Sequence, residues 1–490
     1  MSCCTTCTVP RRHEDGRAMK DTLDLPAGLP PAGLDRTARR ILSGWMFLAV
    51  GSLAVAGGLA LLLAMSRTPV VQDWLPWPWQ SFFRKALVAH VVFAFVVWYL
   101  AMLGGLASAV RPGSLPCALG LALAVGGALL LLVPTLANQG EPSLNNYVPV
   151  LTHPAFFAGL VALAAGVALP VIHMLIRPPV WSGAVTVGVG ASGVLYLLAL
   201  ICFALAWSGL PGGIGAGVAE PLFWGGGHLL QFVHTGLLLT GWQVLGERVF
   251  GRLPLPHRAW IAVMGVLVLA GLPGPVLYGL FPPGAEDLRR AFTWLYWTGL
   301  PLPPLVVGAA LVRALVRGPR NWRSLAFVGL VLSLVLFGLG GVFGAFADGS
   351  DARTPAHYHA VIGGVNLAFM AMVFTFLFPA LLKNSGPSGG PRLSFWLYGG
   401  GQALFSAGMF LAGGAGVGRK VAGTDQGLDS TRKLIGMAMT GTGGAIAVAG
   451  GVLFVWLALA RLMTPGDKAE VKKAVSKETG INDKKGERAR

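Results

Sequence analysis

The chain has 490 residues, of which 54% are hydrophobic and 12% are charged, and its formal net charge is +17. Its apolar residues gather into runs of about twenty separated by short polar breaks, which excludes a soluble protein and predicts an all-α polytopic membrane protein. Because the positive charge flanks these runs, it requires no nucleic acid and is suited to contact with membrane lipid.

In chain order, residues 1–40 are polar and mixed in charge, and we interpret them as a cytoplasmic N-terminal tail without a cleavable signal peptide. Cys3, Cys4 and Cys7 in this tail are either a metal clip or reduced, unstructured thiols. Residues 41–462 form one membrane domain, and residues 463–490 form a basic cytoplasmic C-terminal tail. The membrane domain is predicted to contain about twelve spans, near residues 41–65, 84–108, 115–137, 152–176, 183–209, 222–246, 259–281, 291–316, 324–347, 355–382, 394–415 and 434–461.

Basic residues indicate how the spans are oriented. Arg248, Arg317 and Lys383 follow even-numbered spans, whereas the loops at 138–151 and 210–221 contain no Lys or Arg. Cytoplasmic loops carry an excess of Lys and Arg, so both termini are expected in the cytoplasm.

Three of the histidines inside the expected spans stand out: His90 in the second, and His357 and His359 in the tenth, within "PAHYHAVIGG". Each helical residue advances by about 100°, so residues two apart point to opposite faces. His357 and His359 therefore cannot easily share one metal, although each could bind a separate planar cofactor. The alternative is that they are polar packing residues, but ionisable side chains inside a membrane are costly and favour a functional interpretation.

The order of these histidines along the spans resembles subunit I of the haem-copper oxidase superfamily, which includes cytochrome c oxidases and bacterial nitric oxide reductases. The resemblance covers about residues 40 to 462. It implies a twelve-helix bundle holding two haems, with His90 and His359 as axial ligands of a low-spin haem. It also implies that His357 is the proximal ligand of a high-spin haem whose other face takes O2 or NO.

The same resemblance implies partners and a location. A prokaryotic inner membrane and further subunits of a respiratory complex are expected. Because the chain contains no Cys-x-x-Cys-His motif, the electron donor is expected to be a separate c-type cytochrome.

The segment "GGAGVGRKVAG" before the last span resembles the family's paired-arginine turn beside the haem propionates. The resemblance implies that Arg419 and Lys420 are carboxylate partners on the extracytoplasmic side, Arg419 with bidentate geometry and Lys420 as a point charge. Ordinary loop charge is the alternative.

The sequence departs from the family at its second metal, which is copper or non-haem iron. His228 in "WGGGHLLQFVHTG" stands where the family places the first ligand. Leu230 and Phe232 then replace a Glu and a Tyr of the oxidases, and Phe232 also excludes the Glu of nitric oxide reductases.

The family's adjacent histidine pair is also missing, because its spacing falls on Leu277 and Tyr278. Such a metal needs three or four donor atoms, so His228 alone would not hold it firmly. A site rebuilt from His228 with Gln231, Glu220 and Tyr278 stays open as an alternative.

Two functions compete. The first is a respiratory oxidoreductase that passes electrons from a c-type cytochrome through the low-spin haem to the high-spin haem, where O2 or NO is reduced. Its catalytic residues would be His357, His228, Tyr278 and Gln231. The resemblance also implies a Lys in the eighth span that loads protons in the oxidases, and because this span contains none, proton pumping is not expected. The second is a diverged haem subunit without the second metal, which relays electrons or binds gas within a larger complex. The three histidines argue against a third possibility, a haem-free bundle.

Overall fold

The computed structural model describes residues 34–65, 74, 76–177, 183–210, 215–318, 320–347, 349–383, 388–419 and 426–464. The predictions for Cys3, Cys4, Cys7 and Lys420, and for nearly all of the C-terminal tail, lie outside the described residues.

The described chain forms twelve helical rods, several of them interrupted. The rods are α1 (Arg36–Met65); α2, η2 and α3 (Trp79–Val91, Val92–Val97 and Trp98–Val110); α4 (Ser114–Leu136); α5 (Pro154–Ile176); α6 (Ala184–Gly209); α7 (Ala216–Phe250); α8 and α9 (His257–Gly271 and Pro273–Leu280); α10 and α11 (Glu286–Gly299 and Leu302–Arg317); α12 (Leu325–Gly344); α13, η3 and α14 (Arg353–Met372, Val373–Leu377 and Phe378–Ala380); α15 (Gly389–Gly413); and α16 (Thr431–Met463). Ten of them are long and apolar enough to cross a membrane. The other two, α7 and α15, pack against members of this set, α7 against α6 and α15 against α16. The prediction of an all-α bundle of about twelve helices is confirmed.

Proline breaks two of the predicted spans. The seventh is divided into α8 and α9 at Pro273, and the eighth into α10 and α11 next to Pro301. Proline donates no backbone hydrogen bond and its ring crowds the preceding turn, so a continuous helix is interrupted at these points. The second and tenth rods instead contain π-helical turns, η2 and η3, and η2 begins two residues after His90. Such turns are frequent at functional sites.

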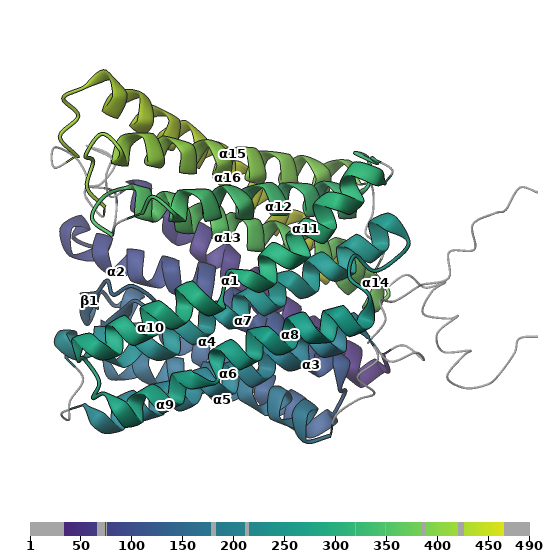
Figure 1. Cartoon of the computed structure of the whole chain (residues 1–490). Coiled ribbons are helices and arrows are strands. Elements are labelled where there is room, and N and C mark those ends of the chain that lie inside the picture. The colour runs from purple at the N-terminus through teal and green to yellow at the C-terminus, as the bar shows by residue number, and fades with distance from the viewer. Residues whose placement is uncertain are drawn as a thin grey trace, which may run out of the picture.

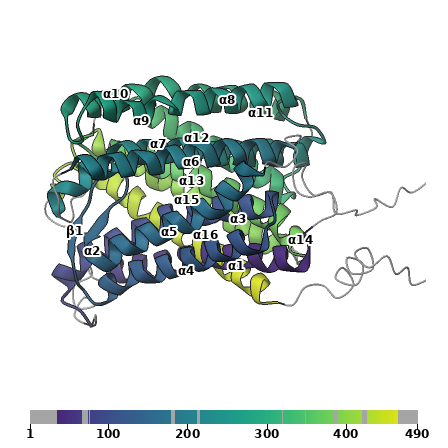
Figure 2. The same ribbon diagram turned by 90° about the horizontal axis from the view of Figure 1, so that it is seen from below.

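The rods run side by side, and each end of the bundle carries a landmark (Figure 1). Strands β1 (Glu141–Ser143) and β2 (Val150–Thr152) pair antiparallel at one end, with Glu141 opposite Thr152. Figure 2 shows α14 at the other end, together with the beginning of α1 and the end of α16. We refer to these as the hairpin end and the α14 end.

Burial separates a central helix from a peripheral layer. In α13 and its extension, 83% of the most apolar stretch is buried, compared with 28% for α8–α9 and 17% for α10–α11. Figure 2 shows the elements α8 to α11 as an outer layer beyond α6 and α7. The histidines of the tenth rod therefore lie on a helix that other rods largely enclose.

Glycine permits the close approach of α12 to α13. A Cβ on Gly364 would lie 2.9 Å from the Phe337 backbone nitrogen and 2.9 Å from the Ser333 carbonyl oxygen. Small residues at such crossings let helix backbones pack closely inside a membrane.

We expect Gly364→Ala to separate α12 from α13 and to lower the stability of the bundle by about 1–3 kcal/mol. Gly341→Ala on α12 is the matched control, because a Cβ there meets nothing within 4 Å. Thermal unfolding of the purified variants measures the difference, and equal melting temperatures would contradict this account of the crossing.

Candidate functional site

His90 is held by a neighbouring helix in one ring orientation. Its Nδ1 lies 2.8 Å from the Ala56 carbonyl oxygen of α1. A carbonyl oxygen only accepts hydrogen bonds, so Nδ1 carries the proton and donates it, and Nε2 keeps a lone pair. This is the arrangement typical of metal-bound histidines, whose second nitrogen is fixed by an outer partner.

His359 of α13 lies near His90 of α2. The two imidazoles are near enough to interact electrostatically. The His359 ring packs edge-on against Phe405 of α15, with ring centroids 4.7 Å apart, and makes no hydrogen bond to any described residue. Two imidazoles from α2 and α13 thus offer free ring nitrogens in one place.

His357 points to a different neighbour. Its Nδ1 donates to the Gly340 carbonyl oxygen of α12 at 2.7 Å, which again leaves Nε2 free. Gly344 makes room for the ring, because a Cβ there would lie 2.7 Å from Nδ1. His357 therefore packs against α12 and His359 against α15, as their spacing on one helix predicts.

His228 differs from these three because both of its ring nitrogens are occupied. Nδ1 donates to the Trp224 carbonyl oxygen at 2.7 Å, and Nε2 accepts from the Tyr147 hydroxyl at 2.9 Å. The residue is buried, with 2% of its surface exposed. No lone pair is left for a metal unless Tyr147 moves away.

Tyr147 comes from the loop between β1 and β2, which sequence reasoning did not single out. Burial first, then Tyr296 and Glu220, raises the pKa of Tyr147 far above its usual range, so its hydroxyl stays protonated and donates. Gly227 lets it approach α7, because a Cβ there would collide with the Tyr147 side chain. The glycines of "WGGGH" were the available signal, although they do not say which residue fills the space.

The other candidate ligands do not converge on His228. Glu220 accepts hydrogen bonds from the Asn146 backbone at 3.1 Å and from its side chain at 2.8 Å. The Tyr278 hydroxyl lies against the backbone of Gly225. Gln231 is half-buried and makes no hydrogen bond to another described residue.

Arg419 lies above the histidine-bearing end of α13. The strand-like segment before it is fixed there, because the Ala352 backbone nitrogen donates to the Val417 carbonyl oxygen at 2.9 Å. The Arg419 guanidinium reaches Asn146 at 3.5 Å and interacts electrostatically with Tyr358. Among the described residues it has no carboxylate partner, whereas Arg353 nearby is paired with Asp351 at 2.7 Å.

The candidate ligands fit haem but do not fit a second metal. His90, His359 and His357 fit haem, because each keeps an imidazole nitrogen free for an axial position. His228 does not fit a second metal, and in the described part of the chain no group of three or more His, Cys, Asp or Glu side chains could hold one.

Comparisons with known proteins agree with the bundle. An uncharacterized protein of Aquifex aeolicus is 32% identical over 348 residues, which cover 68% of this chain and 83% of that protein. An uncharacterized protein of Rickettsia prowazekii is 24% identical, with 85% of this chain and 95% of that protein covered. Cytochrome c oxidase subunit 1 of Thermus thermophilus is 25% identical over 59% of this chain and 58% of that protein.

Among solved structures, a heme-copper terminal oxidase dimer aligns with a TM-score of 0.63 and 17% identity, covering 89% of this chain and 86% of that chain. No protein-family profile matches the chain. The fold is that of subunit I of the haem-copper oxidases, which confirms the resemblance found in the sequence. Within this class, the chain belongs to the same family as the uncharacterized Aquifex aeolicus protein.

We expect Tyr147→Phe to lower stability by about 1–3 kcal/mol, because the buried Nε2 of His228 loses its donor. Tyr296→Phe is the control. The Tyr296 ring belongs to the same aromatic cluster, with its centroid 6.0 Å from that of His228, and its hydroxyl makes no hydrogen bond to a described residue. Chemical or thermal unfolding compares the two variants. A Tyr296→Phe loss as large as that of Tyr147→Phe would contradict a specific role for the Tyr147 hydroxyl.

Proposed function

We propose that this protein is a haem-bearing membrane subunit of a respiratory oxidoreductase, with a low-spin haem between His90 and His359 and a high-spin haem on His357. The observation that carries the proposal is the geometry shared by His90 and His357. Each donates Nδ1 to a backbone carbonyl of the neighbouring helix and keeps Nε2 free. His228, by contrast, uses both of its ring nitrogens.

The protein's contribution is to bind and orient. When bound, haem iron supplies one-electron chemistry and, where one axial position is open, a site for a diatomic gas. His90 and His359 would occupy both axial positions of the first haem. His357 would hold one face of the second from α12, leaving the opposite face for O2 or NO.

Arg419 would neutralise a haem propionate. Its guanidinium is kept above the start of α13 by the contact of Val417 with Ala352 and has no carboxylate partner among the described residues. A planar guanidinium can bind such a carboxylate through two parallel hydrogen bonds. Lys420 would add a second positive charge.

Electrons would enter from a c-type cytochrome at the hairpin end, which faces outward if both termini are cytoplasmic as the basic loops indicate. The membrane would be the inner membrane of a prokaryote, with other respiratory subunits alongside. The proposed activity is reduction of O2 or NO without proton pumping.

A second candidate function is favoured by one specific observation, the saturation of His228. Nε2 is bonded to Tyr147, so a neutral hydrogen-bonded pair would fill the position that the resemblance assigns to the second metal. Such a subunit would bind gas or relay electrons within a larger complex. Under both candidate functions, the Tyr147 hydroxyl keeps its proton and donates it in the hydrogen bond to His228.

Replacement of the ligands tests the assignment by spectroscopy rather than by turnover. His90→Ala or His359→Ala should abolish the low-spin haem bands. His357→Ala should remove carbon monoxide binding and leave those bands in place. His257→Ala, at the beginning of α8 outside the proposed site, is the control and should keep both signals. Carbon monoxide binding that survives His357→Ala would show that the high-spin assignment is wrong.

A further inference from the structure

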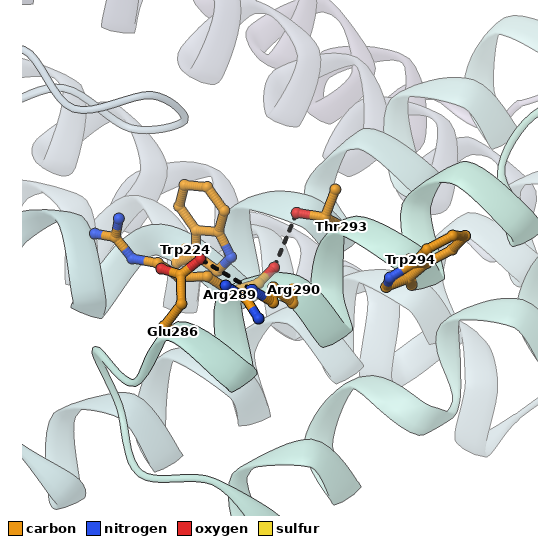
Figure 3. Close-up of a pocket in the computed structure, with 6 residues that line it drawn as sticks. All are labelled: Trp224, Glu286, Arg289, Arg290, Thr293 and Trp294. Carbon is orange, nitrogen blue, oxygen red and sulfur yellow. Dashed lines mark hydrogen bonds and ion pairs between the residues drawn. The ribbon is translucent and has the colours of Figure 1, made fainter. Parts of the chain in front are cut away.

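A cavity of about 240 Å³ lies between α7 and α10, apart from the histidines of the proposed haem site (Figure 3). Its lining residues are Trp224, Glu286, Arg289, Arg290, Thr293 and Trp294. All but Trp224 come from the first turns of α10, so the cavity lies toward the hairpin end of the bundle.

One positive charge in this cavity is not neutralised by the described residues. Arg290 is paired with Glu286 at 3.3 Å, the interaction drawn in Figure 3. Arg289 pairs with no described carboxylate, and its guanidinium carbon lies 5.1 Å from the centroid of the Trp224 ring. Stacking on an indole face holds a guanidinium in place while its N–H groups stay available for a ligand.

A second donor lines the same cavity. The Trp224 indole nitrogen is buried and has no hydrogen-bond partner among the described residues. The Thr293 hydroxyl, by contrast, already donates to the Arg289 carbonyl oxygen at 2.9 Å. A cation and an indole N–H beside one another are suited to an anion with several oxygen atoms, such as a phosphate.

The apolar layer around the cavity indicates that such a phosphate would belong to a membrane lipid. Elements α8 to α11 form the outer layer of the bundle (Figure 2) and expose large apolar side chains along their length. On α9 to α11 the exposed ones include Val276 (63%), Leu280 (66%), Trp294 (70%), Trp297 (54%) and Leu305 (67%). Tryptophan is enriched at the level of lipid headgroups, so the cavity opens where headgroups lie and acyl chains can cover the layer.

We propose that this cavity binds the phosphate of an anionic phospholipid, with Arg289 and the Trp224 indole N–H as donors and the acyl chains along the α8–α11 layer. The site is separate from the proposed haem function, and either can fail without the other.

Native mass spectrometry of the intact, detergent-purified protein tests the site. The probes are dioleoyl phosphatidylglycerol and dioleoyl phosphatidylcholine, titrated separately. Arg289→Gln removes the cation, and Arg289→Lys keeps the charge without the planar group. Arg432→Gln is the matched control, because it removes one exposed charge at the same end of the bundle, in the first turn of α16.

We expect Arg289→Gln to weaken phosphatidylglycerol binding about tenfold or more, as loss of a charge-assisted hydrogen bond does. Arg289→Lys should fall between this variant and the wild type, Arg432→Gln should bind like the wild type, and phosphatidylcholine should bind more weakly throughout. Equal binding by the wild type and Arg289→Gln, or an equal loss in Arg432→Gln, would overturn the proposal. Displacement of the lipid by inorganic phosphate at low millimolar concentration would overturn the lipid assignment in favour of a free-anion site.

Discussion

The i, i+2 spacing of His357 and His359 on α13 is the constraint on which the rest of the site depends. A helix turns such a pair to opposite faces, so α12 and α15 each receive one imidazole. The neighbouring helices then fix what each ring can do. The Gly340 carbonyl oxygen accepts a hydrogen bond from Nδ1 of His357, and α2 brings His90 near His359. Under the proposed function, one helix thereby serves two haems.

Hydrogen-bond saturation distinguishes His90 and His357, which fit a cofactor, from His228, which does not fit a metal. His90 and His357 each use one ring nitrogen for a hydrogen bond to a backbone carbonyl and keep the other free. His228 uses both, one for the Trp224 carbonyl and one for the Tyr147 hydroxyl. The partner that completes His228 belongs to the β1–β2 loop, which is fastened by Asn146 to Glu220 on α7. Asn146 also accepts from the Arg419 guanidinium at 3.5 Å, so this loop links α7 to Arg419.

Much of the fold and of the candidate site could be predicted from local patterns in the sequence. Apolar runs long enough to span a bilayer predicted the rods, and the order of His90, His357 and His359 along them indicated the fold that the structural comparison confirms. The breaks at Pro273 and Pro301 were missed because long apolar runs outweighed single prolines. Tyr147 was missed for a deeper reason: it lies 81 residues from His228, and nothing in either local sequence specifies their contact.

Metal analysis of the purified protein, combined with a reduced-plus-carbon-monoxide difference spectrum, tests the central claim most directly. The account predicts about two iron atoms per chain, a carbon monoxide shift on one haem, and no copper. A stoichiometric copper or a third iron would contradict it, because His228 would then have to release Tyr147 and recruit further ligands. Absence of iron from a fully folded preparation would contradict the haem assignment itself.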